Sequence, residues 1–224
     1  MRSKPIFIFD LDGTLVDSVY QHVLAWKEAL DAEGIELSVW RIHRKIGMSG
    51  GLFTDQLLRE TGCEISQARV DRLQRLHASA YLRYVHQVRP LPGARELLSW
   101  MSDAGYRWAI ATSGRMDVAA GTLATLGIDS TKVPVVTRDQ VEYAKPEPDL
   151  FVAAAERLDS AVDNAMIVGD SIWDMLAARR CRALGVGLLT GGYGLAELQE
   201  SGAFRVYEDP TDLLFHIDEV GGRR

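Results

Sequence analysis

The sequence predicts an α/β fold, a Rossmann-like doubly wound parallel sheet with a helical insertion, and three observations lead to this prediction. Short apolar, β-rich runs alternate with longer segments of helical period, which is typical of a parallel sheet covered by helices on both faces. Several of these runs are almost entirely apolar, as expected for strands buried on both faces. Roughly 95 residues separate the first run from the second, far more than a simple crossover needs.

Five apolar runs are predicted strands, and a sixth is a candidate edge strand. In order, they are residues 6–9, 108–112, 133–137, 165–169, 184–189 and, at the edge, 204–207. Helical segments with start or stop signals lie between the later strands. These predicted helices are 94–104 before Gly105, 117–126 before Gly127, 149–158 after Pro148 and 172–180 after Ser171.

The long insertion is predicted to be helical throughout. Apolar residues recur at spacings of three and four over 19–30, a short helix follows Ser38, and a third helix over 52–60 ends at Gly62. Ser66 opens a long fourth helix whose apolar stripe extends to residue 88. The sequence therefore predicts a four-helix cap domain at 16–88, inserted into an α/β core domain of residues 1–15 and 89–224, with hinges at 15–18 and 89–93.

Composition and charge exclude several classes of protein. The 224 residues carry a formal charge of −6, which disfavours nucleic acids and anionic membranes as partners because both require a basic face. No segment approaches the roughly 18 apolar residues of a membrane span. The two cysteines, Cys63 and Cys181, have no metal or redox spacing. We expect a cytoplasmic monomer or weak homodimer that binds a small molecule, with no nucleic acid and no membrane.

Acidic residues follow two of the predicted strands, at the edge where doubly wound sheets bind ligands. Asp10 and Asp12 follow the first strand, where Gly13 permits the chain to turn. Asp170 and Asp174 follow the fourth strand, and their spacing puts both carboxylates on one face of a helix start. Four carboxylates repel one another unless a hard cation lies between them, and carboxylate oxygens are ligands that Mg²⁺ prefers. These four acids therefore predict a Mg²⁺ site.

The second strand and a later lysine supply groups suited to phosphate. The strand ends at Thr112, and Ser113 and Gly114 add a hydroxyl and backbone amides. Lys145 adds a positive charge. A nucleophilic carboxylate, a metal, a cation and hydrogen-bond donors are what phosphoryl transfer requires. We predict a site for a small phosphorylated metabolite in which Thr112 and Lys145 are catalytic and Ser113 and Gly114 bind substrate.

These segments resemble the four motifs of the haloacid dehalogenase superfamily, in the same order along the chain. DLDGT at 10–14 resembles the opening motif and continues as LVDS, as in phosphoglycolate phosphatase-like members. Thr112 falls on the second motif and Lys145, within KPEPD, on the third; Asp170 and Asp174 fall on the fourth. The resemblance covers essentially the whole chain, although the cap matches by helical character more than by residue.

The resemblance also implies a role for each acid. Asp10 would be the nucleophile that forms an aspartyl-phosphate, and Asp12 would protonate the leaving group and later activate water. Mg²⁺ would be coordinated by Asp10, the main-chain carbonyl of Asp12 and Asp170. Asp174 would either bind the ion or hold its water shell and Lys145.

Two departures from the β-phosphoglucomutase pattern favour a hydrolase. Caps of these mutases normally have an arginine just after a G-x-S segment, whereas here residues 47–49 are followed by Gly50. Their fourth motif usually reads Glu-Asp, and here it reads Gly169-Asp170. A Mg²⁺-dependent phosphatase for a phosphoglycolate or sugar phosphate type of substrate is the leading interpretation. The alternatives are a phosphosugar mutase and a non-catalytic binding protein on the same fold.

The basic cap segment at 41–51 is the candidate specificity element. In caps of this type the equivalent loop closes over the leaving group, and we expect Arg44 or Lys45 to bind a negative or hydroxylated substrate. The alternative is that both are solvated helix charges balanced by nearby acids. His43 is the one histidine whose location suggests function. The tryptophans at 26, 40, 100 and 108 are predicted to be packed in the core or between cap and core.

Overall fold

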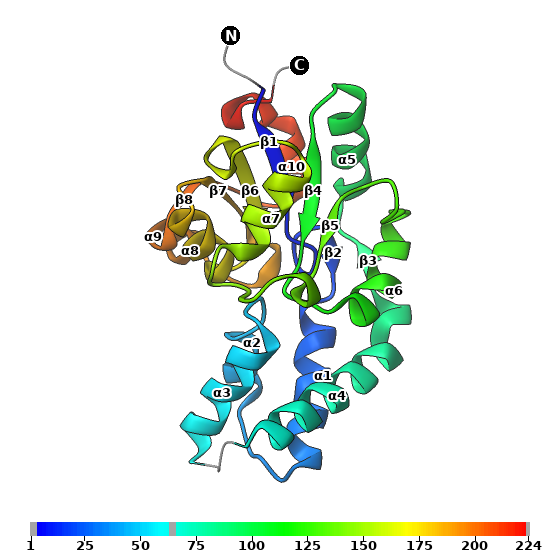
Figure 1. Ribbon diagram of the computed structural model, residues 1–224, viewed down its shortest axis with the longest axis vertical. Helices are drawn as coiled ribbons and strands as arrows, with labels where there is room; N and C mark the ends of the chain where they lie inside the picture. Colours follow the sequence, from blue (N-terminus) through cyan, green and yellow to red (C-terminus); the bar gives the residue numbers. More distant parts are fainter. Residues whose placement is uncertain (1–3, 63–65, 223–224) are drawn as a thin grey trace.

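The computed structural model describes residues 4–62 and 66–222, so that Cys63 lies outside the described residues. Figure 1 shows a parallel sheet flanked by helices, with a separate group of helices beyond one end of the strands. The sheet has six strands in the order β5-β4-β1-β6-β7-β8, and all its pairs are parallel. The strands are β1 (Ile6–Phe9), β4 (Trp108–Ala111), β5 (Val135–Val136), β6 (Ala165–Gly169), β7 (Leu184–Leu188) and β8 (Ala203–Tyr207). The predicted doubly wound parallel sheet is confirmed.

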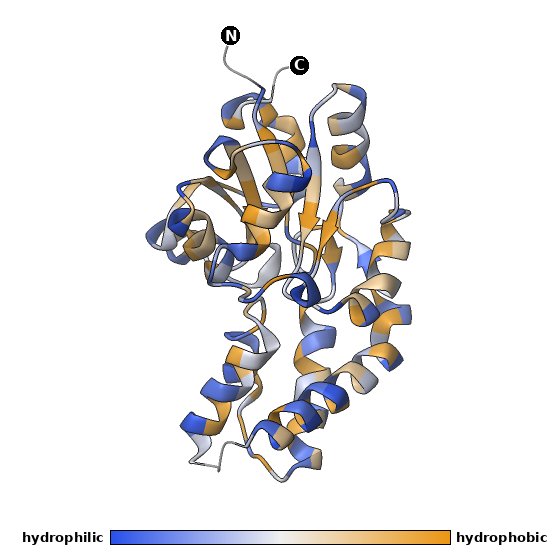
Figure 2. Cartoon of the chain, in the orientation of Figure 1, coloured by the Kyte–Doolittle hydropathy of each residue, from blue (hydrophilic) through white to orange (hydrophobic). Residues whose placement is uncertain are grey.

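Helices cover both faces of the sheet because side chains alternate along each strand. In β1, Ile6 and Ile8 pack in one buried cluster with residues of two helices, α7 (Asp149–Arg157) and α8 (Ile172–Arg180). Phe7 and Phe9 face the opposite layer, in a cluster that includes residues of three core helices. These are α5 (Ala94–Asp103), α6 (Met116–Leu126) and α10 (Pro210–Phe215). Figure 2 shows hydrophobic residues along the strands, whereas the helices mix hydrophobic and hydrophilic residues.

The cap consists of four helices, as the sequence predicts: α1 (Val19–Ala32), α2 (Val39–His43), α3 (Gly50–Thr61) and α4 (Gln67–Tyr84). The hydroxyls of Ser49 and Ser66 accept hydrogen bonds from the backbone of the first turns of α3 and α4, which stabilises these helix starts. Gly62 ends α3 in the left-handed conformation. The cap has its own buried cluster, which includes Trp26, Phe53 and Leu73.

The two chain crossings between core and cap lie side by side. They form a short antiparallel pair, β2 (Val16–Asp17) with β3 (Arg89–Pro90), which the sequence did not predict. The sequence also missed α9 (Leu195–Ser201) and α10, and the third predicted strand is shorter than 133–137. Five 3-10 turns complete the described elements: η1 (Val85–Gln87), η2 (Arg138–Gln140), η3 (Val162–Asn164), η4 (Leu189–Gly191) and η5 (Ile217–Val220).

The prediction for one tryptophan was wrong. Trp26 and Trp108 are buried, and Trp100 packs against the core, but Trp40 is 63% exposed. The short helix α2 buries Ile42 alone, so Trp40 lies on its outer side, where the Arg41 guanidinium lies over its ring. In the described part of the chain, no helix combines the length and apolar character that crossing a membrane requires.

Candidate active site

Lys145 is the buried centre of the site. Its side chain is fully buried, its Nζ contacts Asp10 Oδ1, and Nζ lies 2.8 Å from Asp174 Oδ1. Asp10 directly follows β1, the central strand on which β4 and β6 pair from either side. This is the switch point of the sheet, where the carboxyl ends of neighbouring strands meet. A buried ammonium is stable only when acids are paired with it. Asp10 comes from the end of β1, and Asp174 from the first turn of α8, which follows β6.

Three carboxylates converge beside this lysine. Asp10, Asp170 and Asp174 each place one oxygen within 4.8 Å of the others. Asp170 Oδ1 accepts a hydrogen bond from the Thr14 hydroxyl at 2.8 Å. Asp174 has both oxygens engaged, one by Lys145 and the other by the backbone N–H and hydroxyl of Ser171. The second alternative for Asp174 is that it holds the water shell of the ion and Lys145. The contact with Lys145 is present, and Asp174 also bonds to Ser171 at the start of α8.

Two glycines leave the space that Asp170 occupies. A Cβ at Gly13 would lie 2.4 Å from Asp170 Oδ2, and one at Gly191 would lie 1.8 Å from the same oxygen. Gly13 also has a φ of +82°, a conformation that residues with a side chain rarely adopt. The loop after β1 and η4 can therefore approach the carboxylate only because both positions lack side chains.

The acid cluster carries more negative charge than Lys145 balances. Burial raises the pKa of Asp10 to about 7, and repulsion from Asp174 adds to this while Lys145 opposes it. Burial and repulsion likewise raise the pKa of Asp170 well above its ordinary value. Burial lowers the pKa of Lys145, but attraction to Asp10 and Asp174 outweighs it, so that the lysine stays charged. Hard oxygen donors with surplus negative charge fit a divalent cation such as Mg²⁺.

These pKa values predict how a divalent cation stabilises the protein at different pH. The raised pKa values of Asp10 and Asp170 favour folding below their unfolded pKa near 4. The contribution of Asp10 is lost as pH rises through about 7, and that of Asp170 is lost as pH rises through its own raised pKa. Mg²⁺ competes with protons for the same oxygens. We expect Mg²⁺ to raise the melting temperature more at about pH 8 than at about pH 5, as measured by calorimetry. Equal shifts of the wild-type melting temperature at the two pH values would contradict this account. So would a pH dependence of the shift in Asp170→Asn that is as large as in wild type.

Asp12 is held from the cap rather than from the core. His22 Nε2 lies 3.2 Å from Asp12 Oδ1, and the Ser18 hydroxyl donates to the same oxygen at 2.6 Å. His77 Nε2 lies 3.1 Å from His22 Nδ1, which links α4 to α1. Burial raises the pKa of Asp12, but attraction and hydrogen bonds from His22 and Ser18 outweigh it and lower the pKa. The Asp12 carboxylate is therefore ionised and fixed in orientation.

Neither of these histidines is predicted from the sequence, since the five histidines show no metal spacing and only the location of His43 suggests function. The available signal was their position, since His22 and His77 stand at apolar-stripe spacing on amphipathic helices, with Val19 and Leu73 beside them. His43 instead bonds through Nε2 to the Gly191 carbonyl at 2.8 Å. This contact connects the cap to the loop beside Asp170.

The predicted phosphate-binding residues lie at the end of β4. Thr112 is buried, and its hydroxyl accepts a hydrogen bond from the Gly114 N–H at 3.0 Å. The Ser113 hydroxyl donates to the Gly47 carbonyl at 3.0 Å, and the Ser49 N–H donates to the Lys145 carbonyl at 3.1 Å. The cap thus lies directly against this edge of the core.

A cavity of about 590 Å³ lies between this edge and the cap. Its core side includes Asp10, Asp12 and residues 112–114, and its cap side includes residues of α1, α3 and α4. The structure therefore brings Asp10, Asp12 and the predicted phosphate-binding residues to one end of this cavity, whereas Lys145, Asp170 and Asp174 lie outside its lining. The volume is in the range of ligand-binding pockets and exceeds what a phosphate group alone would need.

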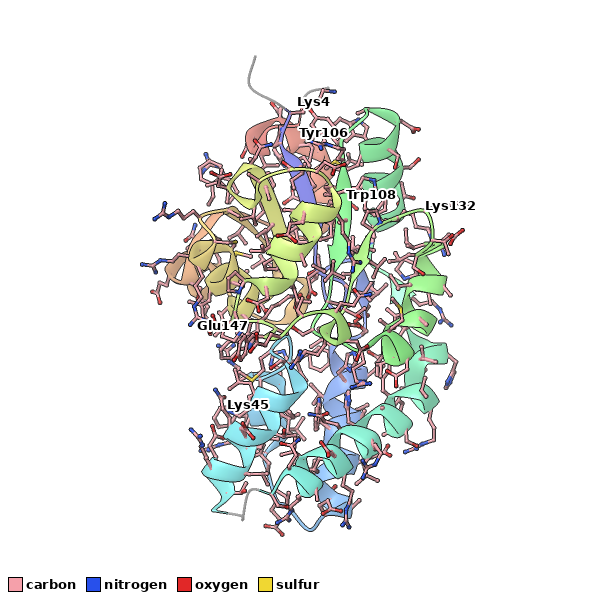
Figure 3. All side chains as sticks on the ribbon, in the orientation of Figure 1. Lys4, Lys45, Tyr106, Trp108, Lys132 and Glu147 are labelled. Atoms are coloured by element: carbon pink, nitrogen blue, oxygen red, sulfur yellow. The ribbon has the colours of Figure 1, made fainter. Side chains whose placement is uncertain are left out.

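Arg44 and Lys45, the two cap residues expected to bind substrate, are each paired with an acid. The Arg44 guanidinium contacts the Glu197 carboxylate and lies over the Tyr193 ring. Lys45 lines the cavity, with its Nζ 2.6 Å from Glu60 Oε1; its position on the cap side is seen in Figure 3. Nearby acids therefore balance both charges, as in the alternative, but the Lys45 side chain is only 12% exposed and is not a solvated charge. Arg44 attaches the cap to the core, and Lys45 is the one of the two at the cavity wall.

The capped α/β fold and this arrangement of acids, threonine and lysine at the strand ends define a class of hydrolases. The family model for haloacid dehalogenase-like hydrolases matches residues 5–182. The chain belongs to this family.

Similar proteins are named as phosphatases or hydrolases, in agreement with this family. The chain is 33% identical over 190 residues to hexitol phosphatase A of Escherichia coli, covering 83% of this chain and 84% of the relative. It is 29% identical over 192 residues to a phosphoglycolate phosphatase of Agrobacterium fabrum, covering 84% and 82%. A crystal structure of a hydrolase from Pseudomonas syringae superposes with a TM-score of 0.96 at 57% identity, covering 98% of this chain and all of that one.

Proposed function

We propose that the protein is a Mg²⁺-dependent phosphatase that hydrolyses a small phosphorylated metabolite through an aspartyl-phosphate on Asp10. The observation that carries this proposal is the ion pair between buried Lys145 and Asp10, placed within a cluster of acids whose charge a divalent cation would balance. The relatives named as hexitol and phosphoglycolate phosphatases support a phosphate monoester as the class of substrate.

In this mechanism each group acts on a defined atom. An Asp10 oxygen attacks phosphorus, and the Lys145 ammonium beside Asp10 favours the ionised, nucleophilic form of this carboxylate. The Thr112 hydroxyl and the backbone amides beside it are donors for the phosphoryl oxygens. Mg²⁺, held by Asp10, the Asp12 carbonyl and Asp170, would screen the charge of the phosphate.

Asp12 completes the reaction in two proton transfers. Because the Asp12 carboxylate is ionised in the free protein, it has to take up a proton when the phosphate ester binds. It gives this proton to the leaving alcohol as the ester bond breaks, which leaves the phosphoryl group on Asp10. It then takes a proton from a water molecule that attacks the aspartyl-phosphate, which releases inorganic phosphate and restores Asp10. His22 and Ser18 hold the carboxylate of Asp12 in position for both steps.

The alternatives have less support. A mutase has to hold a second phosphate, and Gly50 offers no charge at the cap position where such enzymes normally have an arginine. A non-catalytic binding protein would not need the full set of Asp10, Asp12, Thr112 and Lys145, which this chain retains.

The test of the proposed function is hydrolysis of p-nitrophenyl phosphate and a panel of metabolite phosphates by the purified protein, with Mg²⁺ and with a chelator. We expect phosphate release that depends on Mg²⁺. If Mg²⁺ binds by calorimetry but no ester is hydrolysed, the binding protein becomes the better account.

The contact of His22 with Asp12 predicts that the effect of substituting His22 depends on the leaving group of the substrate. His22→Ala leaves Asp12 with the Ser18 hydrogen bond alone, so we expect kcat for an alkyl phosphate to fall about tenfold. Hydrolysis of p-nitrophenyl phosphate should fall much less, because nitrophenolate leaves without a proton. The control is His86→Ala, an exposed histidine of η1. An equal loss with both substrates would mean that His22 serves the fold and not the orientation of Asp12.

A further inference from the structure

The cavity wall contributed by the cap is a rigid aromatic surface with polar groups beside it. Trp26 of α1, Asp55 of α3, and Gln74 and His77 of α4 line this wall. The Trp26 ring is stacked on His77 with centroids 4.3 Å apart and lies 4.2 Å from the Phe53 ring. Its neighbours fix the position of the indole, so it presents a constant apolar surface to a ligand.

The polar groups of this wall suit hydroxyls better than carboxylates. The Asp55 carboxylate accepts hydrogen bonds, and the Gln74 amide can both donate and accept. Burial lowers the pKa of His77 well below its ordinary value, so this imidazole is neutral. A hydroxyl can donate to Asp55, whereas a carboxylate on the leaving group would be repelled by it.

The cations that line the cavity are already engaged among the residues that the structure describes. Lys45 is paired with Glu60 at 2.6 Å, and Arg115 with Asp139 at 3.2 Å. Arg138 donates to the Val141 carbonyl at 2.7 Å. A carboxylate-bearing leaving group such as glycolate would have to compete with these partners for a cation.

Two glycines at the start of α3 keep the wall accessible. A Cβ at Gly50 would lie 4.0 Å from Trp26 Cζ2, and one at Gly51 would lie 3.9 Å from Gln74 Nε2. Longer side chains at these positions would extend toward the indole and the amide. With glycine there, both groups face a cavity of about 590 Å³, which has room for a multi-carbon chain attached to the phosphate.

We infer that this wall binds the leaving group of a polyol or sugar phosphate, through hydroxyl hydrogen bonds to Asp55 and Gln74 and apolar contact with Trp26. The inference rests on the proposed function, because the phosphate of the same ester must lie at Asp10. It assigns substrate selection to Asp55 and Gln74 rather than to Arg44 or Lys45.

The test compares kcat/KM for hexitol phosphate and fructose 1-phosphate, for phosphoglycolate, and for p-nitrophenyl phosphate, which needs no hydroxyl contacts. We expect at least one of the two polyhydroxylated esters to exceed phosphoglycolate by about 100-fold or more, since a site that bonds hydroxyls discriminates strongly against ligands without them. Gln74→Leu should lower kcat/KM for that ester by about tenfold or more and for p-nitrophenyl phosphate by less than about twofold. Asp55→Asn should raise the relative rate for phosphoglycolate.

The matched control is Gln56→Leu, the same substitution on α3 at a position outside the described cavity lining, which should leave every ratio unchanged. A higher kcat/KM of wild type for phosphoglycolate than for the polyhydroxylated esters would overturn the inference. An equal loss of kcat/KM for all esters in Gln74→Leu would do the same. In both cases the proposed function stands as long as wild type hydrolyses p-nitrophenyl phosphate. If wild type with Mg²⁺ hydrolyses none of the esters, the proposed function fails and the inference with it.

Discussion

Asp10→Asn is expected to lower kcat by roughly 10⁴-fold or more, because an amide of the same shape cannot attack phosphorus. Asp10 is 3% exposed and in contact with Lys145, so Asn fits the same space. Phosphate release from p-nitrophenyl phosphate measures the loss. Denatured wild type, quenched during turnover with radiolabelled substrate, should carry covalent phosphate that the variant lacks.

The control for this variant is Asp163→Asn, an exposed aspartate of η3 that should leave kcat unchanged. Circular dichroism and the melting temperature establish that Asp10→Asn is folded. A folded variant that keeps a tenth or more of wild-type turnover would remove Asp10 from the nucleophile role. Covalent phosphate on the variant would do the same.

The elements that the sequence predicts well are those with a continuous signal. The apolar run of β1 ends at a charged residue, and the structure gives the predicted bounds, Ile6–Phe9. The pair β2–β3 is missed because each strand has two residues, too few for any alternation. The helices α9 and α10 are missed for a similar reason, since six or seven residues hardly span two helical turns.

The residues of the candidate site also differ in how well the sequence predicts them. Asp10, Thr112 and Asp170 follow strands, so the topology of a parallel sheet is enough to bring them together. The contact of His22 with His77 joins residues 55 positions apart, and that of Arg44 with Glu197 joins residues 153 apart. Such pairs depend on how α1 packs on α4 and how the cap lies on the core. The periodicity of apolar residues within one helix does not indicate how two helices pack or how the cap lies on the core.

Lys145→Met is expected to destabilise the metal-free protein by about 3–5 kcal/mol, because it removes the shared partner of two buried carboxylates. The Lys145 side chain is fully buried against Asp10 and Asp174, and Met replaces most of its volume without its charge. Urea unfolding at about pH 8 in the presence of a chelator measures the difference in the free energy of unfolding. Turnover should be lost as well, since no ammonium would compensate charge at Asp10.

The control is Lys45→Met, which removes a lysine from the pair with half-exposed Glu60 and should cost no more than about 1 kcal/mol. The effect at Lys145 should also depend on pH. Without the ammonium the pKa of Asp10 rises further above about 7, so Asp10 is protonated and neutral at about pH 5. The destabilisation should therefore be smaller there than at about pH 8. A loss that is the same at both pH values would show that the packing of the lysine chain, rather than its charge, stabilises this site.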